Sequence, residues 1–216
     1  MRLSPAQIAT IEFENDGKFD SLTSTLAPSH FFELVERESA IAERAGAALL
    51  LISVKLDLER YFDRIDSLAD EMAAWREETE DEETEEEIER FSPAQAVARI
   101  ERYIINLSET ISENLRAGDF FSRYSDTGFL ILLRGSEIEF HLAQKRFSEI
   151  IIASERSLEL SHSVHWLRRT ESSPAKSAST KNASPRVHLW MIDSIVRERG
   201  ESRFHLVERI DRLHFN

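Results

Sequence analysis

Residues 116–133 read RAGDFFSRYSDTGFLILL, and this stretch decides the fold. It predicts the end of a helix, a strand at Phe120–Tyr124, a turn at Ser125–Gly128 and a second strand at Phe129–Leu133. Asp and Gly tolerate the backbone conformations of a tight turn, so two β-rich runs around Ser-Asp-Thr-Gly indicate an antiparallel hairpin. A hairpin tip holds its backbone in solvent, where many domains carry their functional groups.

On both sides of this hairpin, helical and strand patterns follow one another. A capping-box start at Ser4 predicts a short N-terminal helix. Helical spacing of apolar residues predicts further helices over His30–Arg44 (ending at Gly46), Asp57–Trp75, a long stretch after Ser92, Phe140–Ile150 and Leu189–Val196. Apolar runs predict strands at Ala48–Leu56, Leu158–Leu167 and Arg203–Val207. This order favours an α/β (α+β) fold, a single domain with a central mixed sheet flanked by helices.

The composition describes a globular chain without membrane insertion. Of its 216 residues 41% are hydrophobic and thirteen are Phe, which is enough for a core, and none is Cys. The absence of Cys excludes disulfides and thiolate metal sites and fits a reducing compartment. The N-terminus has no apolar signal-peptide core, and the longest apolar run, Ala45–Val54, is about half of the roughly 20 residues of a spanning helix. A soluble, cytoplasmic protein is therefore expected.

The negative charge is concentrated in one segment. The net charge is −13, and ten of the acidic residues lie in Glu77–Glu89, which has no Lys or Arg, so the rest of the chain carries −3. This balance excludes nucleic acid as an expected partner. The acidic segment is either a solvated connector or a docking surface for a basic protein partner.

Several local strings, in this order, resemble a GGDEF domain, the diguanylate cyclase fold of bacterial cyclic-di-GMP signalling. Asp20-Ser21-Leu22-Thr23 resembles the family's opening D-x-L-T, and Leu49–Val54 resembles its first strand. Arg116 and Asp119, followed by Arg123 and a five-residue turn ending in Phe129, match the family's R-x-x-D-x-x-x-R-x-GGDEF without a gap. Residues 190–207 resemble its terminal helix and strand.

The resemblance implies a domain organisation. It covers residues 20–207 and leaves 1–19 as an N-terminal helix or linker and 208–216 as a tail. Within the domain, the acidic segment 77–89 is an insertion, and residues 168–186, rich in Ser, Ala, Lys and Pro, form a flexible loop.

The residues that carry the family's catalytic function are replaced in this sequence. The five signature positions hold Ser125, Asp126, Thr127, Gly128 and Phe129, so only the Phe is kept. The two metal-binding aspartates of the first strand fall at Ser53 and Lys55. Phosphoryl transfer depends on positioning and on metal ions that neutralise phosphate charge, so a degenerate domain with no cofactor, no metal and no cyclase activity is expected. Asp126 and Asp57 are the carboxylates that could rebuild a displaced metal site.

The residues of one ligand-binding site of the family are retained in this sequence. The resemblance implies that Arg116 and Asp119 correspond to the R-x-x-D site at which the family binds cyclic-di-GMP, and that Arg197 on the last helix takes the place of a phosphate-contacting Lys. Arg can hold phosphate or a guanine edge with two hydrogen bonds, and Asp can accept from guanine N–H groups. A structural role is the alternative, because Arg is favoured at a helix C-terminus and Asp can cap a turn.

Three functions remain open at this point. The first is a catalytically inactive regulatory domain that senses cyclic-di-GMP, and the second is a protein-interaction module that uses the acidic segment and no nucleotide. The third is an enzyme with residual nucleotide chemistry. The sequence leaves the oligomeric state undetermined.

Overall fold

The computed structural model describes residues 5–8, 10–64, 66–67, 93–170 and 189–215. The acidic segment 77–89 and residues 171–186 of the predicted loop lie outside the described residues. The named elements are α1 (Pro5–Ile8), α2 (Pro28–Ala45), β1 (Ala48–Leu56), α5 (Pro93–Glu113), β2 (Phe120–Ser125), β3 (Gly128–Gly135), α6 (Glu137–Thr170), β4 (Trp190–Val196) and α7 (Arg203–Phe215). Residues 58–64 and 66–67 are also helical.

The first half of the chain follows the predicted pattern closely. β1 spans the predicted residues, and α2 contains the predicted helix. Gly46 ends α2 with φ 65°, and its N–H is directed to the carbonyls of Ala42 and Glu43. Glycine adopts this left-handed conformation without a steric penalty, which is why the helix ends there.

Four strands form one sheet in the order β2-β3-β1-β4. Each neighbouring pair is antiparallel, with Leu50 opposite Leu133 and Ile52 opposite Ser194. The sequence predicted a sheet of mixed strand direction, which is wrong for these four strands. The predicted hairpin is confirmed, since β2 and β3 are adjacent in the sheet and paired along their length.

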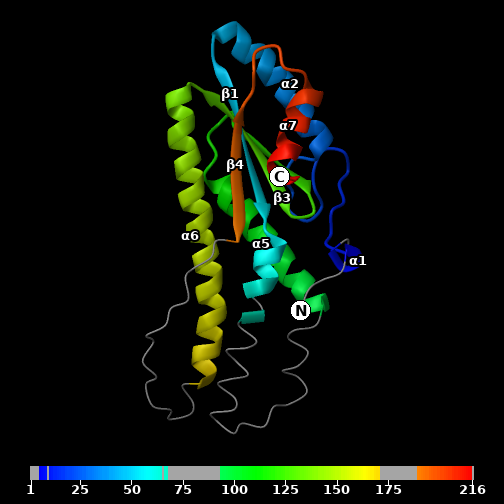
Figure 1. The fold of residues 1–216 in the computed structure, drawn as a ribbon, viewed down its shortest axis with the longest axis vertical. Coiled ribbons are helices and arrows are strands. Elements are labelled where there is room, and N and C mark those ends of the chain that lie inside the picture. The colour runs from blue at the N-terminus through cyan, green and yellow to red at the C-terminus, as the bar shows by residue number, and fades with distance from the viewer. Residues whose placement is uncertain (1–4, 9, 65, 68–92, 171–188, 216) are drawn as a thin grey trace.

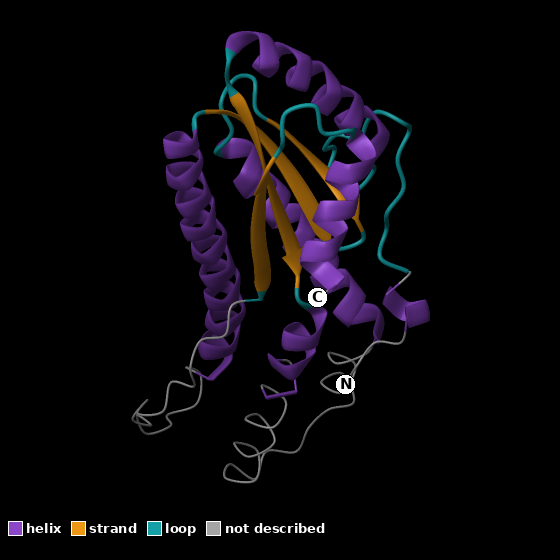
Figure 2. Cartoon of the chain, turned by 45° about the horizontal axis from the view of Figure 1, so that its top comes forward, coloured by secondary structure: helices purple, strands orange, loops and turns teal. Residues whose placement is uncertain are grey.

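Helices cover both faces of the sheet, with α6 on one side and α2 and α7 on the other (Figures 1 and 2). Alternate residues of a strand point to opposite faces, so each central strand feeds two cores. Ile52 and Val54 of β1 pack with Ile104 and Phe147, whereas Leu51 packs with residues of α2 and α7. Such burial on both faces explains why β1 has an almost continuous apolar sequence.

The second half of the chain corrects three predictions. Leu158–Leu167 is part of α6 and not a strand, because no Gly or Pro interrupts residues 137–170. Leu189–Val196 was predicted to be a helix, but all of it except Leu189 forms β4, which pairs with β1. Arg203–Val207 was predicted to be a strand, but it begins α7, which also takes up most of the predicted tail 208–216.

Tertiary pairing explains the exchange of the last two elements. The apolar residues of 189–196 fit a helical period or a buried strand equally well over such a short stretch. Because residues 190–196 form hydrogen bonds with the edge of β1, they adopt the strand conformation. In α7, Leu206 and Ile210 are four residues apart and both are buried, as on one face of a helix. No helix among the described residues is long and apolar enough to cross a membrane.

Candidate functional site

The turn between β2 and β3 is short and attached to β1. Asp126 and Thr127 form it, and the β2–β3 ladder shifts register between Arg123 and Ser125. Thr127 is buried, and its carbonyl accepts a hydrogen bond of 3.0 Å from the backbone N–H of Leu56. The turn is therefore fixed to the end of the central strand.

The side chains of the turn leave no room for a side chain at Gly128. A Cβ at this position would lie 2.7 Å from the Oγ of Ser125 and 2.8 Å from the ring of Tyr124. These distances are too short for a carbon atom, so the absent side chain lets the hairpin close on itself. The glycine serves side-chain packing, and its role does not require a bound ligand.

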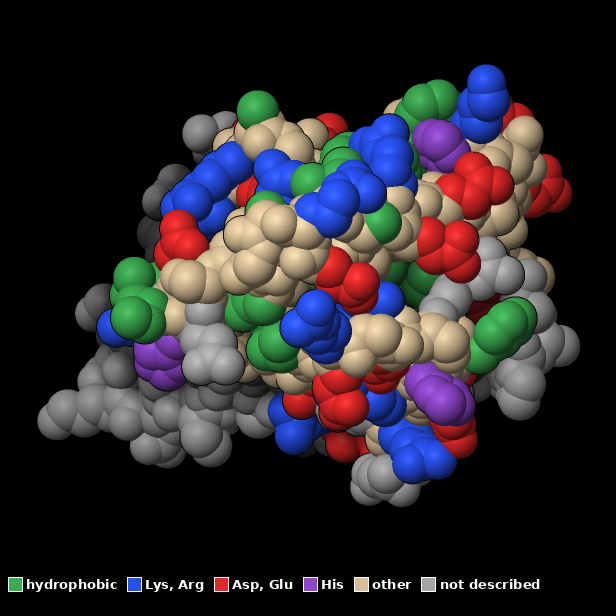
Figure 3. Space-filling view, turned by 90° about the horizontal axis from the view of Figure 1, so that it is seen from above, with side chains coloured by type: hydrophobic (Ala, Val, Ile, Leu, Met, Phe, Trp, Pro, Cys, Tyr) green, Lys and Arg blue, Asp and Glu red, His purple; other side chains and the backbone are tan. Residues whose placement is uncertain are grey.

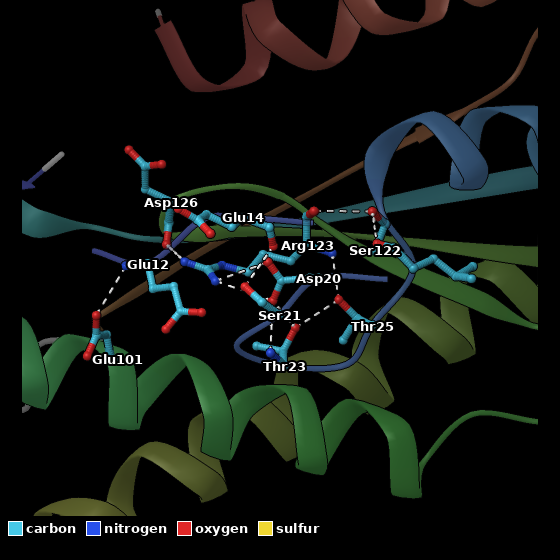
Figure 4. Close-up of polar contacts among 11 residues, drawn as sticks. Glu12, Glu14, Asp20, Ser21, Thr23, Thr25, Glu101, Ser122, Arg123 and Asp126 are labelled. Carbon is cyan, nitrogen blue, oxygen red and sulfur yellow. Dashed lines mark hydrogen bonds and ion pairs between the residues drawn. The ribbon is translucent and has the colours of Figure 1, made fainter. Parts of the chain in front are cut away.

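A buried ion pair holds the hairpin to the N-terminal loop (Figure 4). The side chains of Asp20 and Arg123 have 0% exposure, and Nη1 of Arg123 lies 3.3 Å from both carboxylate oxygens. Nη2 donates to the carbonyl of Asp126 at 2.8 Å. Thr23 donates to Asp20 through its N–H and its hydroxyl, and the N–H of Arg123 donates to Oγ1 of Thr25. These contacts join residues 20–25 to the turn at 126.

Neighbouring groups offset the cost of burying the positive charge of Arg123. Burial lowers the pKa of Arg123 from its ordinary value, and the carboxylate of Asp20 acts in the opposite direction. The guanidinium also lies 5.1 Å from the centre of the Phe13 ring, where the negative face of the ring stabilises a cation. A guanidinium stays protonated at such a site because its intrinsic pKa is so high.

The two first-strand positions do not fit a divalent cation. Ser53 is 2% exposed and its Oγ lies 3.5 Å from the hydroxyl of Tyr124. Lys55 pairs in the ladders with Gly128 and Met191, so it lies on β1 beside the turn. Mg²⁺ requires carboxylate or phosphate oxygens in octahedral geometry, and neither a serine hydroxyl nor a lysine ammonium supplies them.

Among the described residues, no cluster of further ligands surrounds Asp57 or Asp126, the two carboxylates that could rebuild a metal site. Asp57 caps the following helix, because its Oδ1 accepts a hydrogen bond of 3.1 Å from the backbone N–H of Arg60. Its Oδ2 forms an ion pair with Nε of Arg60 at 3.1 Å. Asp126 contributes its carbonyl to Arg123. Within the described ranges, no three His, Cys, Asp or Glu side chains are grouped as metal ligands would be.

Arg116 and Asp119 lie together in the turn that precedes β2. Oδ2 of Asp119 accepts from the backbone N–H of Arg116 at 3.0 Å, and the N–H of Asp119 donates to the carbonyl of Arg116 at 3.0 Å. Asp119 thus closes the turn, as the structural alternative predicted. The side chain of Arg116 is exposed, and its charge contributes to lowering the pKa of Glu139, although the main cause there is hydrogen bonding from Ser136. The site combines an exposed guanidinium with a carboxylate held in place.

Arg197 is in a different place from the one predicted. It follows β4 directly and does not lie on the last helix, and its N–H donates to the carbonyl of Leu49 at 2.9 Å. Its guanidinium pairs with Glu43 at 3.1 Å and donates to the carbonyl of Glu201 at 2.6 Å. Because β4 and β2 are at opposite edges of the sheet, the structure does not bring Arg197 to Arg116.

Comparison with known proteins identifies this architecture. No family model matches the chain, and no curated protein matches it in sequence. Solved structures do match. The GGDEF domain of DgcB from Caulobacter crescentus, in complex with c-di-GMP, is 17% identical over 93% of this chain and 88% of its own, with a TM-score of 0.51. The chain has the fold of a GGDEF domain.

Two further structures with the GGDEF fold agree. A microbial GGDEF domain studied with c-di-GMP is 19% identical over 92% of this chain and 94% of its own, with a TM-score of 0.51. The diguanylate cyclase SiaD from Pseudomonas aeruginosa, in complex with its activator SiaC, is 14% identical over 90% of this chain and 55% of its own, with a TM-score of 0.52. At these identities the likeness establishes the fold.

The ion pair of Asp20 and Arg123 is the structural element that sequence reasoning missed. Both residues belong to strings quoted for the GGDEF resemblance, but 103 positions separate them and nothing local joins them. A signal was present in the strand itself, because Arg123 stands in the middle of a β-rich run whose neighbours are expected to be buried. A charge at such a position requires a partner of opposite sign.

Proposed function

We propose that this chain is a catalytically inactive GGDEF-like domain that regulates a signalling process and binds cyclic-di-GMP through Arg116 and Asp119. The observation that carries the loss of catalysis is the environment of Ser53 and Lys55. A buried hydroxyl beside Tyr124 and an ammonium take the two positions at which the family binds its metal ions. Without a metal to neutralise triphosphate charge, phosphoryl transfer loses its main source of transition-state stabilisation.

Ligand binding is proposed at the turn before β2. The exposed guanidinium of Arg116 can donate two hydrogen bonds to a phosphate or to a guanine edge. The described contacts of Asp119 use Oδ2, which leaves Oδ1 to accept from a guanine N–H. DgcB and the microbial GGDEF domain, two proteins with this fold, interact with c-di-GMP, which supports the choice of this ligand.

Calorimetric titration with cyclic-di-GMP tests the receptor role. The wild type should release heat on binding, and Arg116→Ala should weaken the affinity by at least about tenfold, the effect of losing a charge-assisted pair. The chain provides a matched control, because Arg60 and Asp63 form a second R-x-x-D string in which Arg60 pairs with Asp57. Arg60→Ala should bind as the wild type does. Equal loss in both variants, or no heat with the wild type, would rule out the receptor role.

Incubation with GTP and either Mg²⁺ or Mn²⁺ tests the loss of catalysis separately. Chromatography should show GTP unchanged, because no described cluster of carboxylates can hold the metal–triphosphate complex. Formation of cyclic-di-GMP or of any other nucleotide product would contradict this proposal and would favour an enzyme with residual nucleotide chemistry.

A second candidate function is protein interaction without nucleotide. One structure with the same fold, SiaD, is described in complex with an activator protein. Pull-down with the wild type and with a chain lacking residues 77–89 tests whether the acidic segment takes part. Retention of every partner by the shortened chain would exclude that role for the segment.

A further inference from the structure

The two edges of the sheet are treated differently by the rest of the chain. At the β2 edge, Leu26 forms a bridge with Ser122, and Oγ of Ser122 donates to the carbonyl of Leu26 at 2.7 Å. The N-terminal loop therefore covers that edge. β4 is the other edge strand, and no described strand lies on its outer side. In Figure 1 it lies in front of β1, between α6 and α7.

The hydrogen bonds at the two ends of β4 show which of its backbone groups face outward. Asp57 donates to the carbonyl of Leu189 at 2.8 Å, and Arg197 donates to the carbonyl of Leu49 at 2.9 Å. Hydrogen-bonded and non-hydrogen-bonded pairs alternate along an antiparallel ladder, so the odd-numbered residues of β4 direct their N–H and C=O groups to β1. The even-numbered residues direct theirs to the free edge, and these are Trp190, Ile192, Ser194 and Val196.

This outer edge is open to a further strand. Within the part of the chain that the structure describes, the outward groups of Ile192 and Ser194 have no hydrogen-bond partner. The carbonyl of Val196 accepts from Nη2 of Arg209 at 3.3 Å, and a carbonyl oxygen can accept a second hydrogen bond. Edge strands that resist pairing usually carry Lys, Pro or a bulge. β4 reads WMIDSIV, without Lys or Pro, and its register with β1 is unbroken.

The side chains of β4 make the strand complementary to itself. Ile192 is half-buried against the core under α6, and Val196, on the same face of the strand, is 39% exposed. Asp193 is the only charged side chain of the strand. At the end of the molecule seen in Figure 3, where β4 ends, positive and negative side chains lie near one another with hydrophobic ones between them. A second copy would meet no field of a single sign there.

We propose that two copies of this chain pair through the outer edges of β4, antiparallel about a two-fold axis at Ser194, so that their sheets become continuous. In this register, Ile192 of each copy lies opposite Val196 of the other, and β-branched pairs of this kind stabilise neighbouring strands. Asp193 lies opposite Ile195, whereas an axis at Asp193 would place two carboxylates directly opposite each other. One patch then serves both copies, as a two-fold interface requires. The inference goes beyond the proposed function and does not depend on nucleotide binding.

Sedimentation velocity and amide hydrogen exchange of the full chain, from micromolar to millimolar protein, test the pairing. The wild type should pass from monomer to dimer as its concentration rises. The amides of Ile192, Ser194 and Val196 should exchange more slowly in the dimer, because strand addition gives them acceptors. The amides of Met191 and Asp193 face β1 and serve as internal controls, since their exchange should not depend on concentration.

Substitutions at Ser194 distinguish backbone pairing from a side-chain contact. Ser194→Pro removes an N–H that faces outward, so it costs no hydrogen bond between β1 and β4, and edge strands tolerate Pro at such positions. It should weaken dimerisation by about tenfold or more, because the hydrogen bonds at the axis are lost in both copies. Ser194→Ala keeps the N–H and should dimerise as the wild type does.

A second pair of variants does not depend on Pro. Val196→Lys places a charge on the edge and should also weaken dimerisation. Ile138→Lys, at a position of α6 that is 77% exposed, should leave it unchanged. Urea denaturation shows whether each variant is folded.

Four results would overturn the proposal. They are a wild type that stays monomeric at every concentration, a dimer that survives both Ser194→Pro and Val196→Lys, equal loss in Ser194→Ala and Ser194→Pro, and slow exchange of Ile192 and Ser194 that does not depend on concentration. The last would show that the edge is already covered within one chain. Because Arg116 precedes β2 at the opposite edge, Ser194→Pro should bind cyclic-di-GMP as the wild type does. Failure of this inference is therefore distinguishable from failure of the receptor role.

Discussion

Arg123 and Asp20 illustrate how a single charge in a strand can join distant parts of a chain. Arg123 lies in β2 next to the turn, and Asp20 lies in the loop before α2. Burying either charge alone would cost several kcal/mol, so each is tolerated only because the other is present. The pair, with the contacts of Thr23 and Thr25, holds the hairpin turn in place without contribution from a ligand.

Removing one member of the pair should therefore destabilise the fold strongly. Asp20→Asn leaves the guanidinium of Arg123 without its counter-charge in a site with no exposed surface. We expect a loss of about 3–5 kcal/mol in the free energy of unfolding, measured by urea denaturation. Asp63→Asn, the same change at an exposed position on the helix at 58–64, should stay within about 0.5 kcal/mol. A loss below about 1 kcal/mol for Asp20→Asn would contradict the buried pair.

Two tyrosines, Tyr61, which is buried, and Tyr124, which is partly buried, make the free energy of unfolding depend on alkaline pH. Burial raises the pKa of Tyr61 and of Tyr124, and the hydrogen bond with Ser53 partly offsets the rise at Tyr124. Because the folded pKa exceeds the unfolded value of about 10, the contribution to stability is complete below pH 10. It is lost as the pH rises from 10 toward the folded pKa values.

Absorbance at 295 nm measures this directly. In the folded protein, Tyr61 and Tyr124 should ionise at higher pH than they do in the protein unfolded by urea. Tyr124→Phe should remove one of the late-ionising groups from the folded titration curve. Identical curves for folded and unfolded protein would show that neither side chain is withdrawn from solvent.

At the scale of elements, α5 is attached to the sheet by a narrow apolar stripe. Residues of this stripe recur every three or four positions, and Ile100, Ile104 and Leu107 are all buried. Adjacent residues on the same helix point toward solvent or toward other helices, as Ile105 does with its partial exposure. Ile104 and Ile105 have the same helix propensity and differ in burial. Comparing their substitutions therefore separates the effect of packing from that of helix propensity.

Substitution of these two isoleucines should therefore give unequal losses. Ile104→Ala removes a side chain with no exposed surface and leaves a cavity, so we expect a loss of about 2–5 kcal/mol. Ile105→Ala should cost clearly less, because water can fill part of the vacated space. Both are measured by chemical denaturation, and equal losses would show that α5 is rotated from the position described here.

At the scale of the whole molecule, no three His, Cys, Asp or Glu side chains of the described residues are grouped as metal ligands would be. Helices close both faces of the sheet, and the hairpin turn is held by side chains of the chain itself. Ser53 and Lys55 lie on β1 close to the hairpin turn, and neither offers a carboxylate to a cation. The fold should consequently be independent of divalent metal ions.

Thermal unfolding with and without metal tests this independence. Millimolar Mg²⁺ or an excess of EDTA should leave the melting temperature unchanged, because only a ligand that binds the folded state shifts it. Ca²⁺ and Mn²⁺ serve as further probes. A melting temperature that rises with Mg²⁺ concentration would show a metal site and would count against the loss of the family's metal chemistry.

Local patterns determined much of this structure. The hairpin at 120–133, β1, α2 and the buried stripe of α5 follow from periodicity and from turn residues, because each depends on interactions within about ten positions. Resemblance to the GGDEF family predicted the fold, which the solved structures confirm, and it assigned Arg116, Asp119 and the signature turn to family positions that stay predictions. The proposals of lost catalysis and of ligand binding rest on the residues at these family positions, and they remain predictions.

Only the tertiary structure decided the last third of the chain and the partners of its charges. Residues 190–196 form a strand because the edge of β1 offers them hydrogen bonds, and residues 203–215 form a helix because the apolar face of the sheet covers its buried side. Pairing of β4 with β1 places Arg197 just after a strand and outside the predicted helix. Contacts between the N-terminal loop and β2 bring Asp20 to Arg123. Short segments have no decisive preference of their own, and the contacts that choose their conformation come from residues far away in sequence.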